Sequence, residues 1–231
     1  MSHFLKSAVA VSLRQLSMLI LFLTEGFIMN IVIRSGLGLL ISVLLLAAIQ
    51  TQAADEPQQV VEKVATELFT LANSKNEGKI TEAEYFAKTE AVLDKVVAFR
   101  FIATSVMGSQ VNKKATPAQQ DAFVKVFRSG LVKSYAKGIT NYAKSKIEIA
   151  GVVIDPKKPG RATVTQKVTD KDVTHQLNYT MLLDKKNDQW KLINVVLNGV
   201  NLGTSFQSQF KAAYKKQGND LDKVIANWLA E

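Results

Sequence analysis

The sequence contains no cysteine. This absence excludes disulfide bonds, thiolate metal sites, a cysteine nucleophile and the lipidated cysteine of a bacterial lipoprotein. It does not fix the compartment, because many exported bacterial proteins lack disulfides. With 47% hydrophobic and 21% charged residues, the chain has the composition of a globular protein rather than a disordered one.

Residues that usually carry catalysis are also scarce. His3 and His175 are the only histidines, and His175 lies in a predicted strand, where a lone histidine is usually structural. No G-x-S-x-G, H-E-x-x-H, EF-hand or phosphate-binding glycine motif is present. Most acidic residues after residue 142 fall in predicted turns, where backbone geometry favours Asp. These are Asp155, Asp170, Asp172, Asp184 and Asp188. The sequence therefore predicts no catalytic residues, no metal site and no cofactor.

One long uncharged run stands near the start of the chain. Residues 36–49 carry no charge, Arg34 precedes them, and the small, polar segment "QTQAADEP" follows. A basic flank, a short apolar run and a small-residue exit are typical of a secretory signal peptide. The run is shorter than the roughly 20 apolar residues that span a bilayer. Cleavage is predicted after Ala53 or Ala54.

Residues 1–28 are long for a segment that precedes a signal peptide. Met29 is a candidate translation start that would give a leader of ordinary length. The alternative is a membrane anchor built from "LSMLILFL" and the later run, but Glu25 and Arg34 interrupt any single span. We therefore predict a signal-peptide region at 1–53 and a single domain at 54–231, without internal repeats.

The chain is basic, with a formal charge of +9. Removing residues 1–53 takes away three basic residues and one acidic residue, which leaves +7. Export argues against a nucleic-acid partner. An anionic membrane surface or an acidic protein partner would suit this charge, and so would a solvated basic surface with no partner.

Four helices are predicted before residue 142. Apolar spacing gives helices at 56–74, 78–97, 98–114 and 116–138. Thr81 with Glu84, and Thr116 with Gln119, have the spacing of capping boxes, and Pro117 suits the first position of a helix. A break is expected near Gly108.

Strands and two further helical segments are predicted after residue 142. The strands are expected at 146–154, 161–169, 173–183 and 190–202, and the helices at 205–216 and 220–228. This order predicts an α+β fold, with helices packed on one side of a curved antiparallel sheet of about four strands.

An aromatic stripe follows the fourth predicted helix. Phe123, Phe127, Leu131 and Tyr135 recur every four residues, so one face of this helix must contact something apolar. That contact is either the protein core or an apolar ligand. Because apolar residues abound and catalytic groups are lacking, the sequence favours a protein that holds an apolar molecule.

Two segments resemble a known family. "VMGSQVNKKATPAQQDAFVKVFRSGLVKSYAKGITNY" and "WKLINVVLNGVNLGTSFQSQF" are similar to signature regions of the MlaC-type periplasmic phospholipid-binding proteins, also called toluene-tolerance proteins. Together with the leader and the order of helices and strands, the resemblance covers essentially all of the mature chain. Two positions depart from the family pattern: Asn194 stands where Asp is expected, and Asn201 stands where Ser commonly follows Gly-Val.

The resemblance implies a carrier of diacyl phospholipid between two membranes. It implies a cone-like, nuclear-transport-factor-like fold with an apolar cavity for the acyl chains. It also implies two partners: an outer-membrane lipoprotein–porin complex, and an inner-membrane ABC transporter with a lipid-binding ring. We expect the protein to act as a monomer in the periplasm.

Candidate lipid-binding residues come from the aromatic stripe, the preceding helix and the strands. They are Phe99, Phe101, Val106, Phe123, Phe127, Leu131, Tyr135, Val164, Leu177, Tyr179, Met181, Val196 and Val200. Val200 has the strongest support, since it belongs to the Gly-Val pair of the second signature. For each of the others, ordinary core packing would call for the same side chain. Within the stripe, Phe123 is expected nearer the core, and Phe127 and Leu131 nearer the ligand.

Three other functions stay open at this point. The cavity could hold a different apolar molecule, such as a quinone or an aromatic solvent. An isomerase-type enzyme on a cone-shaped fold would need an acid or a histidine inside the cavity, and His175 is the obvious candidate. A purely structural partner is disfavoured, because it would not need an internal cavity.

Overall fold

The computed structural model describes residues 56–228. The predicted leader, its cleavage site and the candidate start at Met29 lie outside the described residues. No helix within 56–228 is long and apolar enough to cross a membrane.

Four helices occupy the first half of the described chain. They are α2 (Pro57–Asn76), α3 (Glu82–Val96), α4 (Phe99–Lys114) and α5 (Pro117–Asn141). Both predicted capping boxes are confirmed, because the Thr81 and Thr116 hydroxyls accept the N–H groups of Glu84 and Gln119, each at 3.2 Å. The α5 helix ends at Asn141, one turn later than expected.

The predicted break near Gly108 is confirmed. Gly108 has φ 74° and ψ 156° inside α4, so the helix consists of two parts joined at a kink. A positive φ of this kind is accessible to glycine at little cost.

The second half of the chain forms an antiparallel sheet in sequential order. Its strands are β1 (Lys146–Ile154), β2 (Arg161–Asp170), β3 (Val173–Asp184), β4 (Gln189–Leu197) and β5 (Val200–Asn201). The α+β class is confirmed. The long strand predicted at 190–202 is instead divided by a turn at Asn198 and Gly199, whose φ values are 48° and 84°. Asn-Gly is a strong hairpin signal, since both residues tolerate positive φ.

Two helices complete the described chain. They are α6 (Leu202–Lys216) and α7 (Leu221–Asn227). The α6 helix begins directly after β5, three residues earlier than predicted. No loop separates the sheet from this helix.

A β-bulge in β4 shifts which side chains face the helices. Thr180 lies opposite Asn194, whereas the adjacent Met181 lies opposite Leu192, so Ile193 is the extra residue. A bulge of this kind reverses the inward and outward alternation along a strand. Val195 and Leu197 therefore lie on the same side as Leu192.

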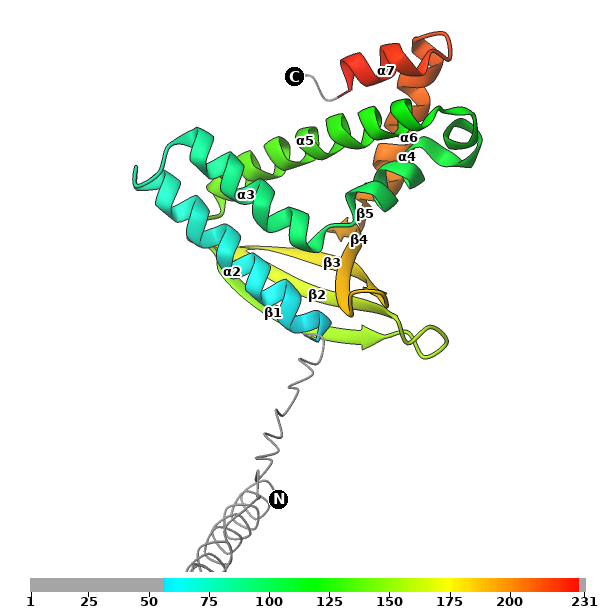
Figure 1. Cartoon of the computed structure of the whole chain (residues 1–231). Coiled ribbons are helices and arrows are strands. Elements are labelled where there is room, and N and C mark those ends of the chain that lie inside the picture. Colours follow the sequence, from blue (N-terminus) through cyan, green and yellow to red (C-terminus); the bar gives the residue numbers. More distant parts are fainter. Residues whose placement is uncertain (1–55, 229–231) are drawn as a thin grey trace, which may run out of the picture. The chain divides into compact units, whose positions relative to one another are not determined.

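The helices cover one face of the sheet in two groups. Figure 1 shows α2, α3 and α5 above the strands and α4 and α6 near β4 and β5, with α7 farther from the sheet, against α5 and α6. Buried apolar residues form three separate clusters rather than one. The first joins α4, α5, α6 and α7, the second joins α2 to the sheet, and the third joins α2, α3 and α5. The space between these clusters is where the candidate site lies.

Candidate functional site

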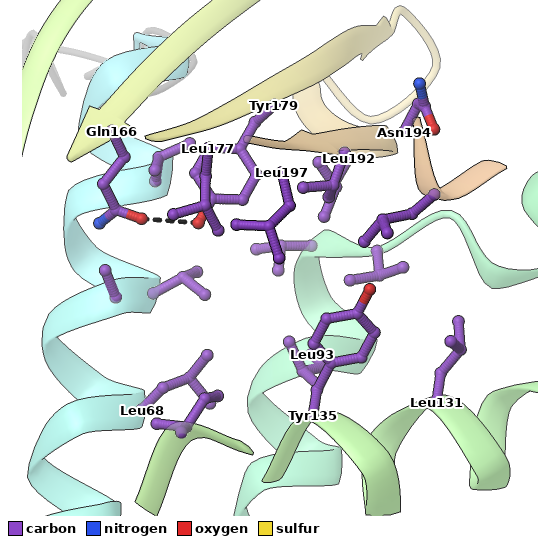
Figure 2. A pocket seen from close by; sticks show the side chains of 18 of the residues that line it. Leu68, Leu93, Leu131, Tyr135, Gln166, Leu177, Tyr179, Leu192, Asn194 and Leu197 are labelled. Atoms are coloured by element: carbon purple, nitrogen blue, oxygen red, sulfur yellow. Dashed lines mark hydrogen bonds between the residues drawn. The ribbon is translucent and has the colours of Figure 1, made fainter. Parts of the chain in front are cut away.

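A cavity of about 600 Å³ separates the helices from the sheet. Figure 2 shows side chains of α2, α3 and α5 directed toward those of the strands. The volume falls within the roughly 300–1,000 Å³ that is usual for sites that bury a small ligand. The helical wall consists of Val60, Val61, Val64, Ala65, Leu68, Phe69, Leu93, Val96, Val97, Phe99, Ile102, Leu131, Ser134, Tyr135, Gly138, Ile139 and Tyr142. The remaining wall consists of Gln166, Val168, His175, Leu177, Tyr179, Met181, Leu192, Asn194, Val195, Leu197, Asn198, Leu202, Gly203 and Phe206.

The cavity wall carries no Asp, Glu, Lys or Arg among the residues that the structure describes. Within the same residues, no group of three or more His, Asp or Glu side chains could hold a metal ion. An ion would lose its hydration here without gaining an opposite charge, which costs several kcal/mol or more. The site therefore suits an apolar ligand.

Part of the predicted residue set comes together at this cavity. The predicted residues that line it are Phe99, Leu131, Tyr135, Leu177, Tyr179 and Met181. They come from α4, α5 and β3, so segments far apart in the sequence meet around one space. Whether each of them contacts a ligand stays a prediction.

Other predicted residues lie in the packed clusters. Val106, Phe123 and Phe127 belong to the cluster between α4, α5, α6 and α7, and Val164 belongs to the cluster between α2 and the sheet. Phe123 and Phe127 are both 0% exposed. The expected division of the stripe therefore needs correction, because the boundary between core and cavity falls after Phe127.

Aromatic contacts explain why Phe127 is not part of the cavity wall. Its ring lies 5.9 Å from that of Phe123 and 5.6 Å from that of Phe206, measured between centroids. The Phe206 ring lines the cavity and meets Phe127 edge-on. Phe127 thus packs against the cavity-lining Phe206 on the side away from the cavity.

Three predicted residues lie outside both the cavity wall and the packed clusters. Phe101 is 46% exposed on α4, and Val200 is 56% exposed on β5. Val196 lies opposite Asn178, on the other side of β4 from Val195 and Leu197. The bulge at Ile193 is the reason, since strict alternation from Leu192 would have placed Val196 inward.

Residues of α2 and α3 are the main part of the wall that the sequence analysis missed. Val60, Val64 and Leu68 line the cavity from α2, and Leu93 and Val96 line it from α3. Their helical spacing was visible in the sequence. Nothing in that spacing showed that they face an empty space rather than a packed core.

A smaller hollow of about 210 Å³ continues the cavity between α5 and α6. It is lined by Leu131, Ser134, Tyr135 and Phe206, all of which also line the main cavity. Tyr135 therefore stands at the junction of the two spaces.

One edge of the cavity is polar and reaches solvent. His175 Nε2 lies 3.4 Å from the Tyr142 hydroxyl, and His175 Nδ1 lies 3.0 Å from Asn198 Nδ2. Asn198 is exposed. Both partners of His175 are uncharged side chains, and no carboxylate of residues 56–228 pairs with the ring, so the arrangement lacks the acid–base pairing of a catalytic histidine.

Two tyrosines place hydroxyl groups within the apolar wall. Tyr179 donates to Gln166 Oε1 at 2.6 Å, and Gln166 is only 2% exposed. Burial raises the pKa of Tyr135 to about 12, and it raises the pKa of Tyr179 further. Both hydroxyls are therefore neutral at physiological pH.

The two residues that depart from the family pattern both accept hydrogen bonds from the first turn of α6. Asn194 Oδ1 accepts the N–H of Gly203 at 3.1 Å, and Asn201 Oδ1 accepts the N–H of Thr204 at 3.1 Å. Each amide oxygen satisfies a free N–H of the first helical turn, as a carboxylate or a hydroxyl would. These substitutions therefore preserve the attachment of α6.

Comparison with known proteins agrees with this architecture. The family model described as "MlaC protein" matches residues 58–230. The chain is 33% identical over 205 residues to the toluene tolerance protein Ttg2D of Pseudomonas putida, covering 87% of this chain and 91% of the relative.

A solved structure shares the fold. It is the phospholipid-binding protein from Ralstonia solanacearum in complex with a phospholipid, with a TM-score of 0.61 and 18% identity. The match covers 73% of this chain and 92% of the other. On the family match and the identity to Ttg2D, this chain belongs to the MlaC family.

Proposed function

We propose that this protein is a phospholipid carrier that encloses acyl chains in the cavity between the helices and the sheet. The observation that carries the proposal is the uncharged cavity of about 600 Å³ in a member of the MlaC family. The phospholipid bound to the Ralstonia protein, which shares this fold, supports it.

The energetics of the task explain why such a cavity suffices. Each methylene exposed to water costs about 0.8 kcal/mol, so two acyl chains make unaided crossing of an aqueous space cost on the order of 20 kcal/mol. An apolar wall offsets most of that cost without a cofactor or a nucleotide. The uncharged wall also avoids trapping the lipid, because no ion pair has to break on release.

The carrier would work in the periplasm, between two membrane complexes. We infer that it takes phospholipid from an outer-membrane lipoprotein–porin complex and passes it to an inner-membrane ABC transporter with a lipid-binding ring, which maintains outer-membrane lipid asymmetry. Family membership supports this assignment. Release would require a partner that opens the cavity, or the ATP hydrolysis of the transporter.

Export would depend on the predicted leader. We expect the exported protein to begin at Ala54 or Asp55. N-terminal sequencing of protein from the periplasmic fraction tests this expectation. Recovery of a chain that still carries residues 1–28 would contradict it.

Identification of the bound ligand is the decisive measurement. Protein purified without added lipid should release diacyl phospholipid into organic solvent, identified by mass spectrometry. Recovery of a quinone or an aromatic compound would instead favour the alternative apolar ligands. A protein that is empty after gentle purification, and that takes no lipid from vesicles, would overturn the carrier function.

A second experiment addresses the enzyme alternative. His175 is the cavity-lining side chain best suited to acid–base chemistry, and it is held by two neutral partners. His175→Gln should leave lipid loading close to that of the wild type, because the amide keeps a neutral hydrogen-bonding group at this edge of an apolar cavity and no ion pair is lost. Loss of lipid loading would point to a direct role for this residue.

A further inference from the structure

Tyr135 places a polar group in the wall of the apolar cavity. It belongs to α5, lines both the main cavity and the smaller hollow, and Figure 2 shows its hydroxyl directed toward the sheet. Its side chain is 37% exposed. The apolar residues that line the same cavity nevertheless surround this side chain, and the resulting desolvation raises its pKa.

The hydroxyl of Tyr135 has no hydrogen-bond partner among residues 56–228. Tyr179 is close enough that the charge of Tyr135, if ionised, would raise its pKa. The Tyr179 proton is already donated to Gln166 Oε1, and Gln166 Nε2 is buried without a partner in the described structure. This part of the wall therefore holds two donor groups, the Tyr135 hydroxyl and Gln166 Nε2, that have no partner within the described residues.

A neutral acceptor on the ligand would suit these donor groups. Both tyrosines stay protonated at physiological pH, and the described wall has no cationic side chain, so a phosphate group here would be desolvated without compensation. An ester carbonyl oxygen is neutral, accepts hydrogen bonds and donates none. In a diacyl phospholipid the ester groups lie where the acyl chains join the head region, and Tyr135 lies where the main cavity joins the hollow between α5 and α6.

We propose that the Tyr135 hydroxyl donates a hydrogen bond to an acyl-ester carbonyl of the bound phospholipid, and so selects ester-linked over ether-linked lipid. The acyl chains then extend into the main cavity, and the head group lies toward the hollow between α5 and α6. The paired Tyr179 and Gln166 form the polar part of the wall near this contact. This inference rests on the proposed carrier function.

A competition between two lipids tests the proposal. The purified protein is mixed with vesicles that contain equal amounts of dioleoyl phosphatidylglycerol and its dioleyl diether analogue, and the bound lipids are quantified by mass spectrometry. We expect the wild type to favour the diester by about three- to tenfold, the effect of one neutral hydrogen bond. Tyr135→Phe should bring the ratio close to one and leave diether binding unchanged.

Tyr214→Phe is the matched control. Tyr214 stacks on Phe210 and lies outside both cavities, so this variant should keep the wild-type ratio. Equal binding of diester and diether by the wild type, or an equal loss of both in Tyr135→Phe, would overturn the ester contact and leave the carrier function intact. Binding of neither lipid would overturn both.

Discussion

Phe123 and Phe127 lie one turn apart on α5, and both are fully buried among aromatic rings of other helices. Phe123 meets Phe210 at 5.1 Å and Trp228 at 5.4 Å between ring centroids. Leu131, one turn further along, lines the cavity instead. The N-terminal part of this stripe thus packs in the core, and its C-terminal part lines the cavity.

Replacement of either phenylalanine tests this division. Phe127→Ala and Phe123→Ala should each lower the free energy of unfolding by about 3–5 kcal/mol, because each removes a packed aromatic side chain. Thermal or urea unfolding, with and without bound phospholipid, measures the loss. We expect the same loss in both states. A loss for Phe127→Ala that changes strongly with lipid would instead place this residue against the acyl chains.

Tyr135 gives the protein a specific sensitivity to alkaline pH. Its pKa is about 12 in the folded protein and about 10 in an unfolded chain. Because the folded value is the higher one, its contribution to stability is present below about pH 10 and is lost as pH rises toward 12. Urea unfolding at pH 9 and pH 11.5 should show a smaller loss for Tyr135→Phe than for the wild type. Equal losses would mean that the hydroxyl is solvated.

At the scale of the elements, the attachment of α6 depends on a close contact with β4. A Cβ atom added at Gly203 would lie 2.6 Å from Asn194 Oδ1, too close for two non-bonded atoms. The same oxygen accepts the Gly203 N–H at 3.1 Å. Any larger residue here would therefore have to displace the Asn194 amide, whereas glycine lets the first turn of α6 reach the cavity wall.

A double-mutant cycle tests this contact. Gly203→Ala should cost about 1–3 kcal/mol in the wild type, the usual cost of overpacking. The cost should fall by about 1 kcal/mol or more in the Asn194→Ala background, where the clashing amide is gone. Urea unfolding of the four proteins gives the coupling energy. Additive effects would contradict a direct clash.

The bulge in β4 is the other element that shapes the cavity. By adding Ile193 to the strand, it brings Val195 and Leu197 inward and leaves Val196 on the outer side. The same strand end then turns at Asn198 and Gly199 into β5, so the wall continues directly into α6.

At the scale of the whole molecule, three small cores surround one empty space. An unfilled apolar cavity forfeits packing contacts, and a bound ligand restores them. A ligand that binds only the native state also stabilises it by linkage. The fold therefore gives up some stability when empty, and binding would recover it.

A larger side chain inside the cavity should reduce lipid binding more than it reduces the stability of the fold. Leu177→Trp adds volume inside the cavity and should lower the amount of bound phospholipid at least about fivefold. Overpacking usually lowers the free energy of unfolding by about 1–3 kcal/mol, and this loss should be smaller here because the added side chain enters free space. Val196→Trp adds the same side chain on the other side of the sheet and should keep the wild-type lipid content. Mass spectrometry of extracted lipid and thermal unfolding measure both effects. Equal lipid content in the two variants would contradict a ligand in this cavity.

The sequence by itself determined the local structure of this protein. The capping boxes at Thr81 and Thr116, the kink at Gly108 and the turn-forming segments specify most helices and strands, because they act through neighbouring backbone groups. The lack of catalytic motifs and the two signature segments were also legible without coordinates. These features predicted an α+β fold of the MlaC family.

Only the tertiary structure decided which apolar side chains border the cavity. A packed core and an empty apolar space call for the same residues, so hydrophobic periodicity does not separate Phe127 from Leu131. A bulge changes the facing of a strand without any fixed sequence signal, and hydrophobicity alone does not separate Val196 from Val195 and Leu197. The position of a void depends on how α2, α3 and α5 meet the sheet, and that distance is set by contacts between segments far apart in the chain.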